Sequence, residues 1–453
     1  MKNKKILKPL LIILLITVVL TWLIPGTQPN QMTGEFELGA TNPEGILSIF
    51  GSFDIIASYF FQNMLVVLFV GMFYGIINKT GAYKELIEKI AKSFKKKKEI
   101  FLILTIAFFI LFPAFANLYF LMFLFVPFFM HVLKELDYKK NIMLLATVGS
   151  ILIGLSGQIA SNMYTLGDGK NPYIWIKVGF LVISTILTVL YALKFNTNDA
   201  KDEDDNMLEL AKRTGKKIDT KPKKMSIVFI VMFIFFLLGF IPWKFNFLSE
   251  MQTAIMEVSI GKFQIFKAIF GTFNPFGAWH TSEFYALLSL TAILIAFLYK
   301  LSFDDFVEGL LEGIKAFLIP ALLVALMSLV TIFTINSGFM ATVIRFITST
   351  GKIVLVTIGS LISAPFAAEP GYIASYNLQI MLSGITEPNV EQISLISQLT
   401  YGILMLFIPT SSILVAGLTY TQKDYKSWIK YIWKLGVVLL ILVFIAILIS
   451  TLI

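Results

Sequence analysis

The sequence predicts an all-α polytopic membrane protein built from inverted-topology repeats, with two re-entrant hairpins and broken helices. Of its 453 residues, 57% are hydrophobic and only 14% are charged, whereas an ordinary soluble domain carries roughly 25% charged residues. Apolar segments recur along the whole chain, and many reach the about 20 residues that a helix needs to cross a bilayer. Motifs of the first half also return in the second half. This pattern excludes a soluble enzyme and a disordered chain.

The chain has no cysteine and only two histidines, which leaves no disulfide, no thiolate site and almost no imidazole for metal chemistry. Its formal net charge of +9 could attract nucleic acid. Lysines and arginines of a membrane protein, however, collect in cytoplasmic loops and set its orientation. We therefore interpret the charge as a signal of orientation, and we expect no nucleic-acid partner and no bound cofactor other than a coupling ion.

The first elements predict a cytoplasmic N-terminus. Lys2, Lys4 and Lys5 precede an apolar run from Ile6 to Pro25. This run is longer than the core of a signal peptide, and no cleavage motif follows it. We therefore expect an uncleaved first helix that crosses outward, and an external position for the polar stretch from Gly26 to Glu44.

The segment from Ile46 to Ile77 is expected to begin as an interfacial helix and to cross inward from about Phe60. It leads into AYKELIEKIAKSFKKKK, in which apolar residues recur at helical spacing with lysines opposite. Such a segment predicts a helix on the cytoplasmic surface, where acidic lipid headgroups are its partner.

A first re-entrant hairpin is predicted between Ile100 and Leu133. Lysines flank this apolar block on both sides, so both of its ends are expected in the cytoplasm. The block is too short for two full crossings of about 20 residues each. Its tip is expected at Pro113-Ala114-Phe115-Ala116-Asn117. Irregular backbone at membrane depth is tolerated only where protein or a water-filled cavity covers it, so the tip predicts a site.

The next segments complete a first domain. Ile142 to Tyr164 is predicted to cross outward with a break at Gly154-Leu155-Ser156-Gly157, and Tyr173 to Phe195 is predicted to return. A charged, polar stretch follows. We therefore divide the chain into residues 1–198, the first repeat with the N-terminal helix, residues 199–225, a cytoplasmic linker, and residues 226–453, the second, inverted repeat.

Beyond the linker, Ser226 to Trp243 and Glu283 to Tyr299 are predicted crossings. An amphipathic cytoplasmic segment from Ser302 to Phe317 is expected before the next crossing, which runs from Phe317 to Ile335. The whole chain then provides about nine crossings and two hairpins.

Three sequence matches indicate an internal repeat. Each pairs a motif of the first half with a motif of the second half at a similar distance. The matches are Trp175-Ile176-Lys177 with Trp428-Ile429-Lys430, at 428 minus 175 or 253 residues, Pro113-Ala114-Phe115-Ala116-Asn117 with Pro365-Phe366-Ala367-Ala368-Glu369, at 365 minus 113 or 252 residues, and Ile77-Asn78 with Ile335-Asn336, at 335 minus 77 or 258 residues.

The flanking charges predict that the two copies face opposite ways. The second apolar block, from Ile353 to Leu382, leads to TEPNVEQ, which lacks basic residues and is expected outside. Inverted repeats of this kind build secondary transporters, whose substrate and coupling ion bind near the midplane between discontinuous helices. The breaks are predicted at Leu155-Ser156-Gly157-Gln158 and at Ile408-Pro409-Thr410-Ser411-Ser412.

Three stretches carry a resemblance to a known family. They are LTWLIPG at residues 20–26, INKTGA at residues 77–82, and IPTSSIL at residues 408–414 together with YKSWIK at residues 425–430. In these stretches the chain resembles the YfcC family, relatives of the anaerobic four-carbon dicarboxylate carriers within the ion transporter superfamily. The resemblance implies an elevator-type carrier of carboxylates or amino acids, driven by Na+ or H+ gradients or by exchange. It also implies a scaffold with a homodimer interface.

The hairpin tips depart from that family. Its first tip is similar to a glycine-rich segment with paired glutamates, whereas this chain has PAFANLYF. Its second tip is similar to a Ser-Gly-rich segment, whereas this chain has APFAAEPGYIASY with one acid. The resemblance therefore does not identify the substrate.

The predicted substrate-binding residues lie at the tips and breaks. Hydroxyls, amides and freed carbonyls suit Na+ or a carboxylate, because hard cations prefer oxygen ligands and anions prefer backbone N–H donors. Small residues in membrane helices also serve as close-packing positions, and both interpretations stay open. The predicted set is Asn117, Ser156, Gly157, Gln158, Asn162, Glu369, Asn377, Pro409, Thr410, Ser411 and Ser412, with a Na+ site near Ser156, Thr410 and Ser411.

Glu369 is the only acidic residue between Ile353 and Gly384. A carboxylate inside a membrane is costly, and by default it is a functional candidate. We expect it to couple transport to protons or to bind a cationic part of the substrate. The alternative is a shallow turn that leaves Glu369 on the outer surface.

The main hypothesis is a secondary active transporter or exchanger in the cytoplasmic membrane of a bacterium. It would move a small carboxylate or amino acid by alternating access, coupled to Na+, to H+ or to a counter-substrate. The alternatives are a membrane-embedded lipid-handling protein of the flippase kind and an integral membrane enzyme, with a passive channel third. Few histidines and few intramembrane acids disfavour an enzyme, and no basic cavity is predicted for a flippase.

Overall fold

The computed structural model of the chain is almost entirely helical. It describes residues 4–30, 32, 34–116, 119–159, 172–195, 221–243, 247–372, 376–383 and 389–452. Eight helices among these residues are long and apolar enough to cross a membrane. The prediction of an all-α polytopic membrane protein is confirmed.

The first half contains three long helices, a surface helix, a hairpin and an interrupted crossing. Its elements are α1 (Lys4–Leu23), α2 (Ile46–Gly51), α3 (Phe53–Ile55), η1 (Ile56–Phe60), α4 (Phe61–Lys79), α5 (Ala82–Phe94), η2 (Lys95–Lys97), α6 (Lys98–Phe115), η3 (Leu121–Leu124), α7 (Val126–Glu135), α8 (Lys140–Leu144), η4 (Leu145–Gly149), α9 (Ser150–Ser156) and α10 (Ile174–Lys194).

The order of elements from α4 to α10 returns after a connecting region. The connecting region holds α11 (Pro222–Phe240), α12 (Phe247–Met256), α13 (Ile265–Phe270) and α14 (Thr281–Leu298). The second half consists of α15 (Phe303–Ser337), α16 (Phe339–Thr348), α17 (Ile353–Ser363), η5 (Ala364–Phe366), α18 (Pro370–Tyr372), α19 (Leu378–Leu382), α20 (Val390–Leu404), α21 (Ser412–Thr421) and α22 (Tyr425–Ser450).

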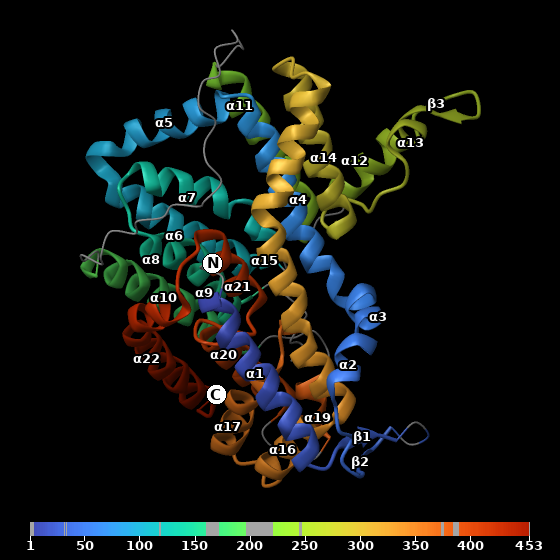
Figure 1. Ribbon diagram of the computed structural model, residues 1–453, viewed down its shortest axis with the longest axis vertical. Coiled ribbons are helices and arrows are strands. Elements are labelled where there is room, and N and C mark those ends of the chain that lie inside the picture. Colours follow the sequence, from blue (N-terminus) through green and yellow to red (C-terminus); the bar gives the residue numbers. More distant parts are fainter. Residues whose placement is uncertain are drawn as a thin grey trace.

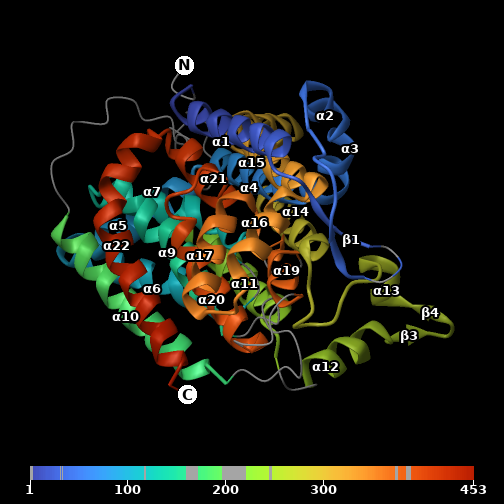
Figure 2. The same ribbon diagram turned by 90° about the horizontal axis from the view of Figure 1, so that it is seen from below.

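Two small antiparallel hairpins are the only sheets in the described part of the chain. One pairs β1 (Thr27–Pro29) with β2 (Phe36–Leu38), and the other pairs β3 (Ser259–Ile260) with β4 (Phe263–Gln264). The β3–β4 hairpin and its neighbours α12 and α13 project from the side of the helical body (Figures 1 and 2).

The same sharp turn introduces the surface helix of each half. Gly81 begins α5 with φ 70°, and Gly338 begins α16 with φ 69°. Glycine adopts this left-handed conformation without the steric cost that a Cβ brings. The two glycines follow the repeated Ile77-Asn78 and Ile335-Asn336 closely, so the sequence match corresponds to one local structure that occurs twice.

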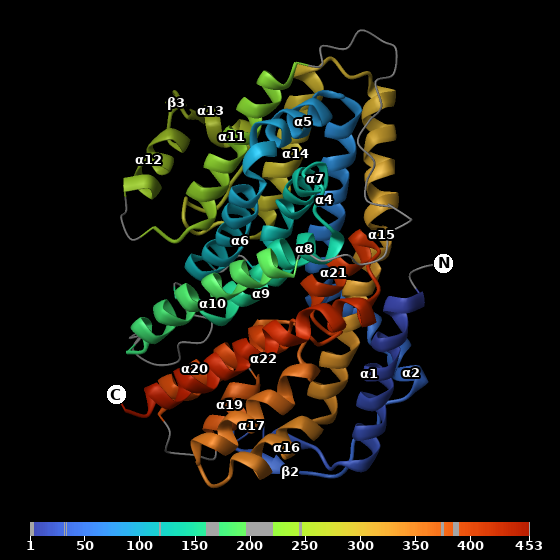
Figure 3. The same cartoon turned by 90° about the vertical axis from the view of Figure 1, so that its left-hand side faces the viewer.

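The two hairpins come from opposite ends of the molecule. The surface helices α5 and α16 lie at opposite ends of the long axis, and each leads into the first arm of a hairpin, α6 or α17 (Figures 1 and 3). The final helices of the two halves, α10 and α22, lie side by side (Figures 2 and 3). This arrangement is the inverted-repeat architecture that the flanking charges predict. The division into residues 1–198, 199–225 and 226–453 stays a prediction, since residues 196–220 fall outside the described ones.

Seven of the eight long apolar helices account for most of the predicted crossings. One of the eight combines α5 with α6, the surface helix and the first arm of a hairpin. The other seven are full-length helices. The two interrupted crossings, α8–α9 and α20–α21, then complete the predicted set of about nine.

Helices α4 and α15 pack against each other through glycines on both sides. Gly71 and Gly75 of α4 face Gly309 and Gly313 of α15, so a Cβ at Gly75 would lie 2.1 Å from the Gly309 carbonyl oxygen. Small residues at this spacing let two membrane helices approach until their backbones touch. At one end of the contact, Lys79 Nζ lies 2.8 Å from Glu312 Oε1 and 3.2 Å from Glu308 Oε2.

Helix α15 differs from its prediction. The sequence predicts an amphipathic surface segment up to Phe317 and a separate crossing after it, but the structure has one continuous helix of 35 residues. Gly309 and Gly313 lie in the expected surface segment, and their packing against α4 holds that segment in line with the rest of the helix. The polar residues that made the segment look like a surface helix include Glu308 and Glu312, which are the partners of Lys79.

We predict that Gly75→Ala destabilises the protein whereas Gly179→Ala does not. The new methyl group at residue 75 would overlap the Gly309 carbonyl oxygen, while a Cβ at Gly179 meets nothing within 4 Å. Overpacking of this kind costs typically about 1–3 kcal/mol, and alanine is otherwise the better helix former. Thermal unfolding of the two variants in detergent measures the difference. Equal melting temperatures would contradict the close packing of α4 and α15.

Candidate functional site

The first interrupted helix holds the tip of the first hairpin. Helix α9 ends at Ser156, and the Gln158 amide nitrogen Nε2 donates to the carbonyl oxygens of Pro113, at 3.1 Å, and Ala116, at 3.0 Å. The backbone N–H of Ile159 donates to the Ala114 carbonyl at 2.7 Å. The last carbonyls of a helix have no partner within the helix. Residues after the break therefore satisfy the end of α6.

The second interrupted helix holds the second tip in the same way. Helix α20 ends at Leu404 and α21 begins at Ser412. Between them, Thr410 Oγ1 donates to the Pro365 carbonyl at 2.8 Å. Tyr401 of α20 donates its hydroxyl to the Ala367 carbonyl at 3.3 Å.

These two contacts are equivalent positions of the internal repeat. Gln158 lies 45 residues after Pro113, and Thr410 lies 45 residues after Pro365. Both donors are side chains of the break, and both acceptors are carbonyls of the repeated proline. The repeat found in the sequence is therefore also a repeat in hydrogen bonding.

The two interrupted helices cross each other at a glycine. A Cβ at Gly402 of α20 would lie 2.2 Å from Ser156 Oγ and 2.6 Å from the Leu152 carbonyl oxygen. One turn earlier, the Gln398 amide donates to the carbonyls of Ser156, at 3.1 Å, and Gln158, at 2.8 Å. Helix α20 thus caps the end of α9 and joins the two halves.

A buried lysine completes this crossing. Lys177, in the first turn of α10, donates from Nζ to Gln398 Oε1 at 2.8 Å, and its side chain is only 4% exposed. Lys177, Gln398 and Gln158 therefore form a continuous chain of polar contacts from α10 to the first tip.

Glu369 lies at the second tip with its carboxyl group inside the protein. The carboxyl group interacts with the side chains of Ser412, at the start of α21, and Asn63, in α4. Its oxygen Oε1 is inaccessible and has no hydrogen-bond partner. The alternative of a shallow turn that exposes the Glu369 carboxyl group is therefore not supported.

Buried polar atoms without a hydrogen-bond partner gather near the two tips. Among the described residues they include Gln158 Oε1 and the Tyr119 hydroxyl near the first tip, and Glu369 Oε1 and the Tyr376 hydroxyl near the second. More than nine in ten buried polar groups in proteins are paired, so each exception calls for an explanation such as a ligand, an ion or water. The Tyr138 hydroxyl, which follows α7, is a further such atom, so the tips are one part of the structure with unused capacity to bind a polar ligand.

The other predicted site residues are placed as follows. Gly157 ends α9, where a Cβ would press on the Leu181 side chain at 2.5 Å. Thr410, Ser411 and Ser412 are buried at the second break, Pro409 is half-buried there, and Asn377 is buried in the return arm of the second hairpin. Asn117 and Asn162 fall outside the described residues. The hydrogen bonds place Ser156 against α20 and Thr410 against the second tip, and the predicted Na+ site near Ser156, Thr410 and Ser411 stays a prediction.

The repeated Trp-Ile-Lys motif does not correspond to one packing arrangement. Trp428 is fully buried and its Nε1 donates to the Leu406 carbonyl at 2.8 Å, whereas Trp175 is 80% exposed. The lysines behave in the opposite way, since Lys177 is buried and Lys430 is exposed. The motif marks the repeat, but its residues have taken different roles in the two halves.

Sequence reasoning missed Lys177 and Gln398. The sequence does indicate Lys177 as a candidate, because it is a charged residue inside an apolar segment, and such residues are functional candidates by default. The indication for Gln398 is weaker, since it is only an amide in the crossing before the second break. The two residues lie 221 positions apart in the chain. No local pattern therefore indicates that they form a pair at the site.

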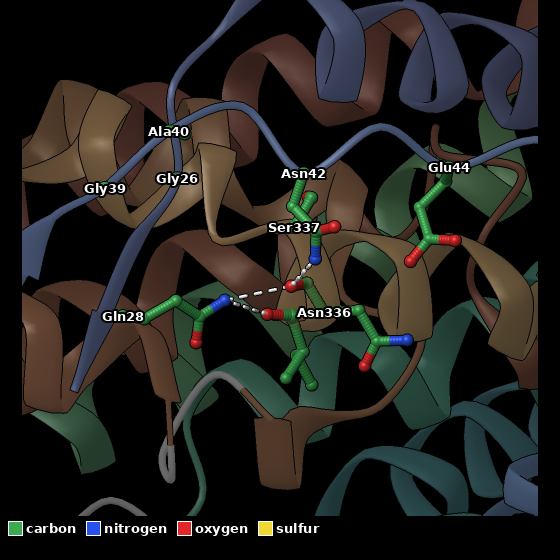
Figure 4. A pocket seen from close by; sticks show the side chains of 9 residues that line it. Gly26, Gln28, Gly39, Ala40, Asn42, Glu44, Asn336 and Ser337 are labelled. Atoms are coloured by element: carbon green, nitrogen blue, oxygen red, sulfur yellow. Dashed lines mark hydrogen bonds between the residues drawn. The ribbon is translucent and has the colours of Figure 1, made fainter. Parts of the chain in front are cut away.

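A cavity of about 620 Å³ lies between the segment that follows α1 and the end of α15 (Figure 4), and no residue of either tip lines it. Gln28 Nε2 donates to the carbonyls of Ile335 and Asn336 at 3.1 and 2.9 Å, and Asn42 Nδ2 donates to the Asn336 carbonyl at 3.0 Å. These amides satisfy the last carbonyls of α15. These amides already hydrogen-bond to the protein and hold the segment after α1 against α15. We therefore place the candidate site at the tips instead.

The chain matches a family model over residues 4–452, and the family is described as the C4-dicarboxylate anaerobic carrier, DcuC. Two solved structures are similar to it. The YdaH transporter of Alcanivorax borkumensis, reported to have an unusual topology, is 12% identical with a TM-score of 0.42, over 98% of this chain and 97% of that chain. MtrF of Neisseria gonorrhoeae, described with a class of antimetabolite efflux pumps, is 12% identical with a TM-score of 0.37, over 97% and 93%. No curated protein sequence matches the chain significantly.

We predict that Thr410→Val loosens the second tip. The substitution removes the donor to the Pro365 carbonyl, and an unsatisfied buried acceptor costs about 1–3 kcal/mol. Thr185→Val is a matched control, because Thr185 donates only to the Leu181 carbonyl one turn back in its own helix. Hydrogen exchange with mass spectrometry should show faster exchange of peptides at residues 364–372 in the first variant alone. Unchanged exchange there would mean that the threonine does not hold the tip.

Proposed function

The chain belongs to the C4-dicarboxylate anaerobic carrier family, and on this premise we propose that it is a secondary active transporter or exchanger of a small carboxylate. It is a membrane transporter rather than an enzyme. We place it in the cytoplasmic membrane of a bacterium with the N-terminus inside, because the lysine-rich segments around α5 and η2 lie at one end of the molecule (Figure 1) and such segments favour the cytoplasm.

The observation that supports the proposal most strongly is the pair of hairpin tips held by interrupted helices. Each tip is bonded to its own break, through Gln158 or Thr410. Buried polar atoms without partners lie at both tips. In an otherwise apolar protein, such a site fits a small polar substrate at membrane depth.

The second break offers groups that suit a carboxylate. The first backbone N–H groups of α21 have no acceptor within the helix, and the helix dipole makes this end positive. The hydroxyls of Thr410, Ser411 and Ser412 lie at the same end. Backbone donors and hydroxyls at a helix N-terminus bind anions.

The first break offers groups that suit a coupling cation. Gln158 Oε1 is a buried acceptor without a partner, and Ser156 adds a hydroxyl at the end of α9. Oxygen atoms at the C-terminal end of an interrupted helix favour cations such as Na+. We therefore propose Na+ or H+ as the coupling ion, with exchange for a counter-substrate as the other form of coupling.

Glu369 is the residue that we propose couples transport to protons. Its carboxyl group interacts with Ser412 at the start of α21, which is where a carboxylate substrate would bind. An ionised Glu369 would repel an anionic substrate, because like charges at short range in a low dielectric strongly disfavour each other. A proton on Glu369 removes this repulsion and would travel with the substrate.

We propose that alternating access moves the hairpins and interrupted helices against α4 and α15. The glycine contact and the Lys79 ion pairs make α4 and α15 a closely packed pair that suits a fixed scaffold. Surrounding lipid, and a second copy of the chain against this scaffold, are the partners that an elevator-type carrier would have.

We predict counterflow of a C4-dicarboxylate in proteoliposomes. Vesicles loaded with unlabelled succinate should accumulate labelled succinate transiently, because a carrier exchanges substrate through an alternating site. Amino acids and monocarboxylates tested in parallel define the substrate class. Downhill flux without counterflow would indicate a channel instead, and chemical conversion of succinate would indicate an enzyme.

We predict that Glu369→Gln abolishes the pH dependence of succinate uptake while leaving expression intact. Glutamine keeps the size of the side chain but cannot exchange a proton. Glu250→Gln, at an exposed acid of α12, is the matched control and should keep the wild-type profile. The measurement is initial uptake rate against external pH for the three proteins. An unchanged profile in Glu369→Gln would remove the coupling role.

A further inference from the structure

Lys177 is a buried cation with a neutral partner. Its Nζ donates to Gln398 Oε1 at 2.8 Å, and the side chain is 4% exposed. No carboxylate lies within ion-pair distance of it in the described part of the chain. Buried charges in proteins are normally paired, because the loss of hydration is costly. The ammonium group therefore has an unmet preference for an anion.

The neutral partner cannot meet this preference. The Gln398 amide nitrogen donates to the carbonyls of both Ser156 and Gln158, which fixes the amide and turns its oxygen Oε1 toward Lys177. That oxygen accepts one of the three N–H donors of the ammonium group. Within the described residues the other two donors have no acceptor, so they are available to a ligand.

The surrounding helix ends do not neutralise Lys177 either. The residue stands in the first turn of α10, where the helix dipole adds positive potential. The carbonyls at the end of α9 contribute partial negative charge, but two of them already accept from Gln398. The local field thus favours an anion beside Lys177, and that anion would also offset the repulsion between the ammonium group and a coupling cation at Gln158 Oε1.

We propose that Lys177 is the cationic anchor of the substrate site and binds one carboxylate of a C4-dicarboxylate. This inference rests on the proposed function and names the residue that recognises the substrate charge. Gln398 positions the ammonium group, and the polar chain through Gln158 connects the anchor to the first tip. Charge-assisted hydrogen bonds from an ammonium group to a carboxylate are about twice as strong as neutral ones.

The position of Lys177 gives each of the two breaks a place for one carboxylate. Helix α20 contacts Lys177 and α9 through Gln398, and it contacts the second tip through Tyr401, three residues later. A substrate with two carboxylates could use Lys177 on one side of α20 and the start of α21 on the other. A substrate with one carboxylate could use only one of these places.

The test compares two proteins, with lysine or methionine at position 177, and two ligands. Wild-type protein and Lys177→Met are reconstituted in nanodiscs, and binding of succinate and of succinamate, in which one carboxylate is an amide, is measured by calorimetry. The wild type should prefer succinate by about 10- to 100-fold. Lys177→Met should lose this preference, so that its affinity for succinate falls to that for succinamate. A preserved preference would overturn the proposal.

Two further variants keep the test decisive. Lys430→Met changes the exposed lysine of the second Trp-Ile-Lys motif and should keep the wild-type preference. If Lys177→Met does not fold, Gln398→Glu replaces it, since a carboxylate placed beside Lys177 would compete with the ligand and weaken succinate binding by a similar factor. A full succinate preference in Gln398→Glu would overturn the anchor. Absence of any succinate binding to the wild type would overturn the proposed substrate class and the anchor with it.

Discussion

The structure depends on how the ends of broken helices are satisfied. A chain that stops a helix inside a membrane leaves carbonyl and N–H groups that neither lipid nor a neighbouring turn can pair. This protein solves the problem twice with the same contact, from Gln158 to the Pro113 carbonyl and from Thr410 to the Pro365 carbonyl. The solution brings polar side chains to membrane depth, and those side chains form the candidate site. The function thus follows from a backbone requirement.

Close backbone packing provides the frame in which these contacts form. The glycines of α4 and α15 allow the two helices to touch, and Gly402 lets α20 cross α9 at Ser156. The crossing then places Gln398 against the end of α9 and Lys177 against Gln398. The two halves therefore share one polar core at the crossing of α9 and α20, and the movements of a transporter would have to keep or exchange these bonds together.

Local sequence signals predicted much of this fold, but they did not predict contacts between residues far apart in the chain. Lysines on both sides of a short apolar block predicted the first hairpin, and the internal repeat predicted the second. Prolines, glycines and small polar residues predicted the tips and breaks, because chain stiffness acts over a few residues. The continuity of α15 was missed because its surface-like glutamates find a partner in Lys79. The pairing of Lys177 with Gln398 spans 221 residues, so no local pattern shows it. The repeated Trp-Ile-Lys motif indicates the repeat, but it does not show that Lys177 is buried and Lys430 is exposed.

The inverted arrangement of the hairpins is the central claim, and the absence of cysteine from the chain makes it directly testable. Single cysteines at Lys97, before α6, and at Lys352, before α17, stand at exposed positions. Labelling of intact and opened cells with an impermeant maleimide reports the side of each cysteine. The structure predicts that the cysteine at position 352 is labelled from outside, and that the cysteine at position 97 is labelled only after the cells are opened. Labelling of both from the same side would contradict the account.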